Sequence, residues 1–514
     1  MKILGDLIQP INKRTIFVVL LLLALAIGGY FVIKEILRPK TVPSVLNPGF
    51  EPDLSGWVSA GKVEADGHFG TSCLTHGAGK LETTQTLTQV SNGWYTLKVW
   101  VNSSGKQNQA YIALKDCSGE ETRTAVPISR NDWLHIVVSV KITNQQCTIS
   151  LYSDNEGEAW VNFDDIEFVP GCAALSVMGA DISSLKKSED KGGVYADENG
   201  VQGDALKILH DHGLNYARIR VWVNSPDGYH GKAQLLEMAK RLKAQNIKLL
   251  VDFHYADSWA DPGKQPKPAA WENLDFEDQK KALYTHTFDT CNSLKEQGTL
   301  PDIVQIGNEI NNGMLWPDGK NDKSFDNLAA LLKEGYRAVK DCSPDTLVML
   351  QLAEGGANKM FQWWFDSIIA LDVPFDLIGV SYYPYWHGTL ADLQNNLNDI
   401  AVRYEKDIII VETAYAFTPD DNDNYENIIR FQEQPGYPFT PEGQAKILAD
   451  IMTITRAIPN GRGLGVFWWD ATWTAVPGNG WDPFRPSSGN NWENQALFDF
   501  QNRALPAMEL FAKP

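Results

Sequence analysis

Eight short apolar runs alternate with amphipathic stretches through the C-terminal two thirds of the chain. The runs cover residues 175–182, 216–223, 247–254, 303–309, 346–352, 377–383, 408–413 and 465–470. Helical spacing predicts helices between them, for example over residues 234–245, 325–339, 390–404 and 443–457. Because apolar strands alternating with helices indicate a parallel sheet covered on both faces, we predict a (β/α)8 TIM barrel over residues 171–514. A doubly wound open sheet is the alternative, but no G-x-G-x-x-G or P-loop pattern follows any run.

The region from residue 43 to residue 170 shows short alternating runs broken by Gly, Asn, Asp and Ser. The runs cover residues 96–102, 110–115, 135–142, 147–153 and 159–169. Regularly spaced strands without a helical period predict an all-β sandwich. Trp57 and Trp94 follow turn-forming glycines, and both are candidates for an exposed surface on which a sugar could stack.

The N-terminal segment, residues 1–42, contains eighteen consecutive uncharged residues at 16–33 with basic residues on both sides. About eighteen such residues is the lower limit for a membrane-spanning helix. A cleaved signal peptide is the alternative, because the Ala-Leu-Ala sequence at 24–26 resembles a cleavage site. We favour an uncleaved signal anchor. Under either interpretation the folded part lies outside the cytoplasm, in the periplasm, on the cell surface or in the medium.

The six cysteines contain no C-x-x-C pair, which argues against zinc and redox motifs. An even number of cysteines in an exported chain indicates disulfides, with buried free thiols as the alternative. We expect the pairs Cys117 with Cys147, Cys73 with Cys172, and Cys291 with Cys342. The four cysteines before the barrel permit three connectivities, and the sequence does not choose among them.

The chain is acidic and rich in tryptophan. It has 45 basic and 64 acidic residues, a net charge of −19 and 17 tryptophans. That charge has the wrong sign for a protein that binds phosphate backbones, which excludes nucleic acid as a partner. Flat aromatic side chains among carboxylates suit sugars, whose C–H faces stack on indoles while their hydroxyls bond polar groups.

Polar residues close most of the eight apolar runs, where the catalytic residues of a barrel lie. Glu309 closes the fourth run and Glu412 lies at the end of the seventh. A single Glu there is often a loop or helix-cap residue, but two carboxylates at one barrel mouth suit glycoside hydrolysis, with one acid and one nucleophile. Metal-dependent hydrolysis is the rival, yet the nine histidines are scattered through the chain and show no H-E-x-x-H spacing.

Several motifs give these positions a more specific meaning. Asn308-Glu309 together with Glu412 resembles the large clan of retaining barrel glycosidases, and the chain is similar to glycoside hydrolase family 53, the endo-β-1,4-galactanases. The matching strings are MGAD at 178–181, RVWVN at 220–224, DFHYADSWADP at 252–262, QIGNE at 305–309, GVSYYP at 379–384, VET at 411–413 and GVFWW at 465–469. They cover every strand of the barrel except the fifth.

The resemblance implies that Glu309 is the acid/base, that Glu412 is the nucleophile, and that Asn308 contacts the sugar 2-hydroxyl. It implies that Arg220 and His254 hold the two carboxyls in place electrostatically. The alternative for Arg220 is a purely structural role, in an ion pair with an acid such as Asp181.

Other strand-end residues would bind substrate. The resemblance implies that Tyr382 or Tyr383 reaches the nucleophile and that Trp469 forms the floor under the sugar being cleaved. Asp181 and Trp259, from the matching strings, are also candidates for substrate binding, although a rim tryptophan is often only packing. Two departures from the family concern subsites: Gln351 stands where family members commonly carry His, and Asp470 follows Trp469 where they carry Glu.

The sandwich region carries a second, weaker resemblance. The strings NPGFE at 47–51 and NFDDI at 162–166 resemble the first and last strands of jelly-roll carbohydrate-binding modules. In such modules the matching acids often hold a structural calcium, so Glu51 and Asp165 are candidate ligands. The alternative is that both are solvated acids at strand ends.

The sequence thus predicts a monomeric, extracytoplasmic enzyme that is tethered to a membrane by its N-terminal segment and needs no cofactor for catalysis. The implied activity is retaining endo-hydrolysis of β-1,4-galactosidic bonds in galactan or type I arabinogalactan, the side chains of pectin. One alternative keeps the chemistry and changes the polysaccharide substrate to a mannan or glucan. Another alternative is a noncatalytic glycan receptor, against which the intact Glu309 and Glu412 pair argues.

Overall fold

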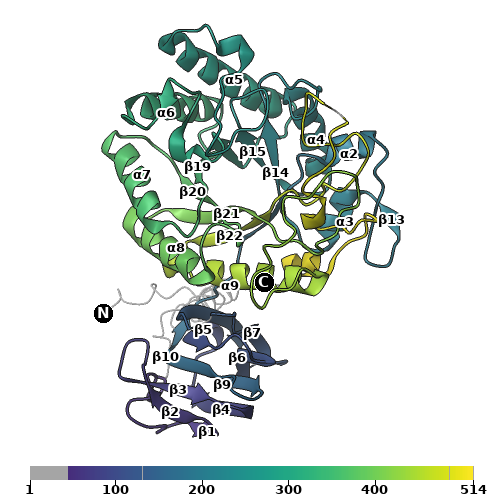
Figure 1. Ribbon diagram of the computed structural model, residues 1–514. Coiled ribbons are helices and arrows are strands. Elements are labelled where there is room, and N and C mark those ends of the chain that lie inside the picture. Colours follow the sequence, from purple (N-terminus) through teal and green to yellow (C-terminus); the bar gives the residue numbers. More distant parts are fainter. Residues whose placement is uncertain (1–43, 118, 130, 486, 513–514) are drawn as a thin grey trace, which may run out of the picture.

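The structure, a computed structural model, describes residues 44–512 apart from residues 118, 130 and 486. The apolar stretch 16–33, for which we expect a signal anchor, lies outside the described residues. Within the described ranges, no helix has both the length and the apolar character needed to cross a bilayer. Two parts follow one another along the chain: an all-β sandwich, and then a barrel of strands and helices (Figure 1).

The sandwich consists of two five-stranded antiparallel sheets, as the alternating runs predict. One sheet has the order β1-β4-β9-β6-β7, with β1 at Val58–Ser59, β4 at Gly79–Thr88, β9 at Gln146–Asn155, β6 at Gln109–Lys115 and β7 at Thr122–Ala125. The other has the order β2-β3-β10-β5-β8, with β2 at Lys62–Ala65, β3 at Ser72–His76, β10 at Val161–Pro170, β5 at Gly93–Ser103 and β8 at Leu134–Ile142.

Side-chain alternation along β5 settles which face of this strand is buried. Val99 and Val101 are fully buried in the sandwich core, and Trp100 points the other way. The Trp100 ring stacks on the imidazoles of His68 and His135, with ring-centroid distances of 3.8 and 5.0 Å. These two rings cover part of the indole, which is half-buried.

The structure separates the two tryptophans expected to form a sugar-stacking surface. Trp57 is only 8% exposed, and its indole N–H donates to the Asn47 carbonyl oxygen. Trp94 is 44% exposed. Trp57 is thus part of the packed core, and Trp94 remains as a candidate for sugar stacking.

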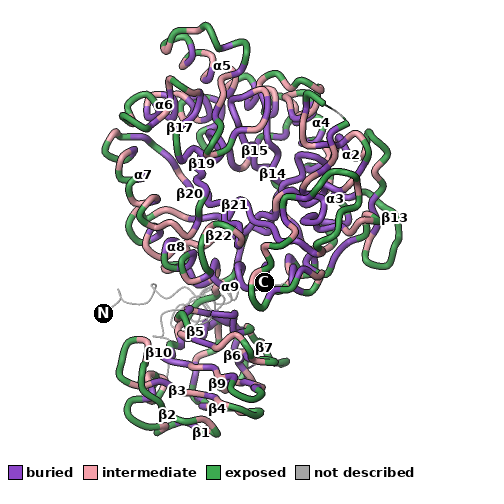
Figure 2. The backbone as a smooth tube through the Cα atoms, in the orientation of Figure 1, coloured by how far each residue is buried: buried purple, intermediate pink, exposed green. Residues whose placement is uncertain are grey.

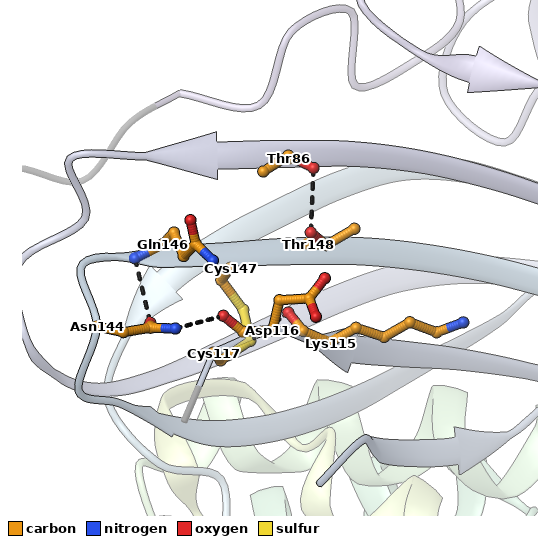
Figure 3. The surroundings of a disulfide bond; sticks show 8 residues. All are labelled: Thr86, Lys115, Asp116, Cys117, Asn144, Gln146, Cys147 and Thr148. Atoms are coloured by element: carbon orange, nitrogen blue, oxygen red, sulfur yellow. Dashed lines mark hydrogen bonds between the residues drawn. A yellow bond between two sulfur atoms is a disulfide. The ribbon is translucent and has the colours of Figure 1, made fainter. Parts of the chain in front are cut away.

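One of the three expected disulfides is present. Cys117 and Cys147 are bonded, and the Asn144 side chain beside them donates to the Asp116 carbonyl oxygen (Figure 3). The other two pairings are wrong, because the four remaining cysteines are free: Cys73, Cys172, Cys291 and Cys342. Burial raises the pKa of the Cys73 thiol to about 11. It is a packed core thiol, whereas Cys172 is exposed at the surface.

The expected calcium site is not supported. The Glu51 carboxylate accepts hydrogen bonds from the backbone N–H and hydroxyl of Thr71 and Ser72, which lowers the pKa of Glu51. Asp165 bonds the His68 imidazole instead, with 2.8 Å between Oδ2 and Nδ1. Within the part of the chain that the structure describes, no cluster of three or more His, Cys, Asp or Glu side chains could hold a metal ion. These acids join the ends of the sandwich strands through protein donors.

All eight predicted barrel strands are confirmed, and they close in chain order as a parallel barrel. They are β11 (Val177–Asp181), β14 (Tyr216–Val221), β15 (Lys248–Phe253), β16 (Ile303–Ile306), β19 (Leu347–Leu352), β20 (Leu377–Ser381), β21 (Asp407–Thr413) and β22 (Gly463–Trp468). Buried backbone lines the centre of the barrel and exposed backbone its periphery (Figure 2). Continuous apolar strands thus mark a sheet covered on both faces.

The helices surround the barrel. They are α2 (Leu185–Asp190), α3 (Ala205–Asp211), α4 (Lys232–Ala244), α5 (Phe276–Glu296), α6 (Asp326–Cys342), α7 (Asn358–Ala370), α8 (Leu390–Tyr404) and α9 (Pro441–Arg456). Short elements in the connections are β12 (Tyr195–Ala196), β13 (Gln202–Gly203), β17 (Gly313–Met314), β18 (Gly319–Lys320), η1 (Ala269–Trp271), η2 (Ile310–Asn312), η3 (Pro459–Gly461), η4 (Glu493–Gln495) and η5 (Pro506–Ala512). Helix α8 has the predicted bounds because Thr389 and Asp392 form a capping box at its start.

The sandwich packs directly against the barrel beside α9 (Figure 1). The Gln394 side chain of α8 accepts from the backbone N–H of His135 and donates to the carbonyl oxygen of the same residue, at 2.6 and 2.8 Å. Ile128 of the sandwich lies against Gly436, where a Cβ atom would be 2.0 Å from Ile128 Cδ1. The two parts are therefore joined by specific contacts as well as by the chain between β10 and β11.

Candidate active site

A cleft of about 510 Å³ opens at the C-terminal ends of the barrel strands. Both Glu309 and Glu412 line it. Six tryptophans form much of its wall: Trp259, Trp386, Trp469, Trp473, Trp481 and Trp492. The last three come from the loop after β22. Carboxylates surrounded by indoles are the surface that a neutral sugar chain requires.

Glu309 follows β16 in a left-handed backbone conformation, with φ 48° and ψ 53°. Such a conformation is uncommon for residues other than glycine, and it persists where neighbours hold it. Here the Glu309 backbone N–H donates to Gln351 Oε1 at 2.7 Å. Burial and the nearby Glu412 carboxylate raise the pKa of Glu309 well above its ordinary value, so this carboxyl keeps its proton to higher pH.

Glu412, on β21, is held by three side chains. Its Oε1 lies 2.7 Å from Arg218 Nη2 and accepts from Gln351 Nε2 at 3.1 Å, while its Oε2 accepts from the Tyr383 hydroxyl at 3.0 Å. Burial raises the pKa of Glu412, but Arg218 opposes that effect. A negative charge on Glu412 is therefore stabilised more strongly by its neighbours than a negative charge on Glu309.

Arg218, and not Arg220, contacts the nucleophile candidate, so our assignment of Arg220 to that contact is wrong. Arg220 lies 3.3 Å from Asp470 and stacks over the Trp259 ring at 4.2 Å. Residues two apart on a strand share a face, so both arginines point into the barrel. The tilt and register of the barrel strands determine which side chains each guanidinium contacts.

Two further candidates lie beneath the cleft. The Asp181 side chain is fully buried, and its Oδ2 accepts from Arg218 at 2.9 Å. The Tyr382 hydroxyl donates to the Gly388 carbonyl oxygen, so Tyr383 is the tyrosine that reaches Glu412. Asp181 and Tyr382 thus hold neighbouring groups in place and do not line the cleft, which corrects their assignment as substrate-binding residues.

His254 and Asn308 do line the cleft. The Ala260 backbone N–H donates to His254 Nδ1 at 3.3 Å, so His254 carries its proton on Nε2, which lies 2.9 Å from Asp252 Oδ2. Asn308 Oδ1 accepts from Arg218, and its amide N–H donates to the Ala260 carbonyl oxygen. Neighbouring groups hold both side chains in place at the cleft.

Four polar residues inside the apolar runs complete the site: Asp252, Gln305, Gln351 and Ser381. Asp252 accepts from Arg218 at 2.8 Å and from Gln305 Nε2 at 2.7 Å. In the sequence these residues stand within the family motifs or depart from them, and the pattern alone gives none of them a role. The available signal was a polar residue within a buried strand, which requires a hydrogen-bonding partner there.

Comparison with known proteins gives consistent findings. The family model described as glycosyl hydrolase family 53 matches residues 177–511. An endo-beta-1,4-galactanase of Bacillus subtilis (strain 168) is 33% identical over 381 residues, covering 67% of this chain and 87% of that protein. The arabinogalactan endo-beta-1,4-galactanase A of Aspergillus niger is 35% identical over 310 residues, 59% of this chain and 86% of its own. The solved Ignisphaera aggregans GH53 catalytic domain is 41% identical with a TM-score of 0.63, covering 66% of this chain and 97% of that one.

Proposed function

The chain belongs to glycosyl hydrolase family 53, and from this premise we infer that its barrel hydrolyses β-1,4-galactosidic bonds within galactan or type I arabinogalactan, with retention of configuration. The observation that carries the inference is the pair of buried carboxyls, Glu309 and Glu412, at one tryptophan-lined cleft. Burial keeps one carboxyl protonated while Arg218 favours the charge on the other.

We assign Glu309 as the acid/base and Glu412 as the nucleophile. In the first step a Glu412 carboxylate oxygen bonds to the anomeric carbon, and Glu309 gives its proton to the glycosidic oxygen as the bond to the leaving sugar breaks. In the second step Glu309 takes a proton from water, whose oxygen bonds to the same carbon and releases Glu412. The two side chains supply the proton and the nucleophile, so the reaction needs no cofactor.

The tryptophans on the cleft wall support an endo-acting enzyme. Trp386, which is 50% exposed, lies on the cleft wall, and Trp259 and Trp481 are joined by an N–H···O bond of 2.7 Å. Indoles on the cleft wall let a chain stack on both sides of the reacting bond. We expect His254, Asn308 and Trp469 to contact the sugar being cleaved.

The sandwich, residues 43–170, extends this proposal to insoluble substrate. We propose that it binds wall polysaccharide and raises the concentration of chain ends and loops near the barrel. Its exposed Trp94 is the residue best suited to sugar stacking. We further propose that the enzyme acts as a monomer outside the cytoplasm, tethered through residues 1–42.

A digest of four purified polysaccharides tests the proposed activity: β-1,4-galactan, arabinogalactan, mannan and glucan. We expect new reducing ends from the first two, and proton NMR should show that the β-anomer forms first. Cleavage of mannan or glucan in place of galactan would favour another substrate with the same chemistry. If the protein binds galactan but releases no new reducing ends, it is a noncatalytic glycan receptor.

A further inference from the structure

A second cavity, of about 450 Å³, lies between the sandwich and helix α9 of the barrel. Residues of β7 and β8 line it from one side, and residues of α9 line it from the other. Its volume is within the range of about 300–1,000 Å³ that is typical of ligand sites. Among the described residues, none lines both this cavity and the cleft that contains Glu309 and Glu412. The cavity is therefore a separate site, and both parts of the molecule form it.

Two polar residues of α9, Asp450 and Thr453, line the cavity from the barrel side. They are three residues apart, so they share one face of the helix. Asp450 is 2% exposed and Thr453 is 5% exposed. The Tyr437 hydroxyl donates to Asp450 Oδ2 at 2.7 Å, but within the described part of the chain no group hydrogen-bonds Asp450 Oδ1 or the Thr453 hydroxyl. Buried polar groups nearly always have a partner, so these two take theirs from whatever fills the cavity, which is water or the hydroxyls of a ligand.

The sandwich side of the cavity carries aromatic and basic residues. Trp94 and Lys141 lie opposite one another on β5 and β8, and Arg123 lies on β7. All three are exposed, so the cavity can be reached from solvent. Neither Arg123 nor Lys141 forms an ion pair with any described acid, and the Arg123 guanidinium lies over the Tyr111 ring at 5.0 Å. Both cations are therefore available to an anionic ligand.

The charges that line the cavity differ from those of the chain as a whole. The chain has a net charge of −19, whereas three basic residues and one acid line the cavity, namely Arg123, Lys141, Arg456 and Asp450. Burial raises the pKa of Asp450 to about 6, and the Lys446 ammonium, one turn earlier on α9, opposes that rise. Arginine bonds carboxylates through a fixed fork of donors, and an indole stacks on the apolar face of a sugar ring. The cavity thus suits a sugar that carries a carboxylate.

We propose that this cavity binds a short sugar chain that carries carboxylates. A sugar ring stacks on Trp94, and its carboxylates bond Arg123 and Lys141. Its hydroxyls bond Asp450 and Thr453 of the barrel helix. The proposal rests on the polysaccharide binding that we proposed for the sandwich, and it names the class of ligand and the helix that completes the site.

The acidic ligand would place the enzyme next to its substrate. Galactan is a neutral side chain of pectin, and the backbone of pectin is acidic. A site for the acidic backbone, outside the cleft, would hold the barrel beside galactan without competing with galactan for the cleft.

Calorimetric titration of the full chain with trigalacturonate at neutral pH tests the site. We expect binding that weakens as the NaCl concentration rises, because salt screens exposed charges. Arg123→Ala and Lys141→Ala should each raise Kd about tenfold, through the loss of one charged contact. Lys106→Ala, which removes an exposed charge from the sandwich outside the cavity, should leave Kd unchanged. A failure of the wild type to bind, or equal losses in all three variants, would overturn the proposal.

Thr453→Val distinguishes a shared site from one on the sandwich alone. The change removes a hydroxyl of the barrel helix and keeps the shape of the side chain, so Kd should rise about three- to tenfold. Thr455→Val is the matched control, because the Thr455 hydroxyl donates to the Ile451 carbonyl oxygen and the residue does not line the cavity. Both variants should cleave soluble galactan at the wild-type rate. A wild-type Kd in Thr453→Val would contradict the contribution of the barrel.

Hydrogen exchange gives a readout that needs no variant. Trigalacturonate should slow amide exchange in β8 and in α9 together, and neutral galactotriose should slow it only around the cleft. If galactotriose protects β8 and α9 and trigalacturonate does not, the proposal is wrong.

The same measurements separate this inference from the proposed function. A wild type that cleaves galactan and binds insoluble wall material, but does not bind trigalacturonate, would overturn the inference and leave the proposed function in place. A wild type that binds trigalacturonate at this cavity and cleaves no galactan would contradict the proposed activity and support the inference.

Discussion

The Nη2 atom of Arg218 lies 2.7 Å from Oε1 of Glu412, and the same guanidinium contacts Asp181 at 2.9 Å and Asp252 at 2.8 Å. Arg218 is 1% exposed, and the two aspartates are fully buried. A planar guanidinium can bond several carboxylates from fixed directions, which a compact ammonium does not do. The position of the Glu412 carboxylate therefore depends on Arg218, Asp181 and Asp252, which come from three other strands of the barrel.

Arg218→Lys should lower kcat/KM on galactan on the order of 10² to 10³-fold, because the ammonium cannot replace all the guanidinium contacts. The acidic limb of the pH profile should move to higher pH, since a weaker cation allows Glu412 to hold its proton longer. Arg220→Lys is the matched comparison on the same strand. Because Arg220 contacts Asp470 and Trp259 instead, we expect a smaller loss and no shift of the acidic limb. Equal effects of the two variants would contradict the assignment of Arg218.

Removing either of the two carboxyls proposed to be catalytic should give a distinct defect. Glu309→Ala should retain much more activity on a galactoside with an acidic phenol leaving group than on galactan, because such a leaving group needs no proton. Glu412→Ala should be inactive on both substrates, and azide should restore turnover with inverted product. The roles are wrong if both variants lose activity equally on both substrates and neither responds to azide.

Glu309→Gln should stabilise the fold at neutral pH. Because the folded-state pKa of Glu309 is raised, the neutral form is favoured on folding, and this contribution is present at low pH and lost as the pH rises from about 4.5 towards the folded pKa. The amide stays neutral throughout. The difference in Tm between variant and wild type should be small at pH 4 and grow with pH in calorimetric scans. A constant difference would argue against a raised pKa.

Gln394→Ala tests whether the sandwich and the barrel unfold together. This change removes both hydrogen bonds to the His135 backbone and leaves the cleft untouched. We expect calorimetry to resolve two transitions, because the interface loses about 1 kcal/mol for each hydrogen bond. Lys359→Ala, on the exposed start of α7, is a control that should keep the wild-type transition.

Deleting residues 43–170 should leave turnover of soluble galactan nearly unchanged and weaken attack on insoluble wall material. The sandwich contacts α8 and α9 on the outside of the barrel, and none of the sandwich residues that the structure describes lines the cleft. Rates on both substrates give the measurement. Equal losses on the two would contradict the role proposed for the sandwich.

The fold was largely predictable from local pattern. Eight apolar runs became the eight barrel strands because a strand buried on both faces must be apolar along its whole length. Alternating runs became the two sheets of the sandwich, and Thr389 marked the start of α8 through its cap. Glu309 and Glu412 came to one cleft because the carboxyl ends of barrel strands meet at one mouth.

What the sequence could not decide depends on distances between strands. Arg218 and Arg220 lie two residues apart on one strand, so the sequence shows only that both point into the barrel. The register of the closed barrel determines that Arg218 is the one that contacts Glu412. The same holds for Gln351, whose partners lie on β20, on β21, on β16 and just after β16, 30 to 61 residues away along the chain. The disulfides depend on the same distances: Cys147 lies on β9, Cys117 lies two residues beyond the end of the neighbouring strand β6, and the other four cysteines do not pair. The face of a strand on which a side chain lies is a local property of the sequence. Its hydrogen-bonding partners depend on the tilt and register of the strands, which are established only when the whole barrel closes.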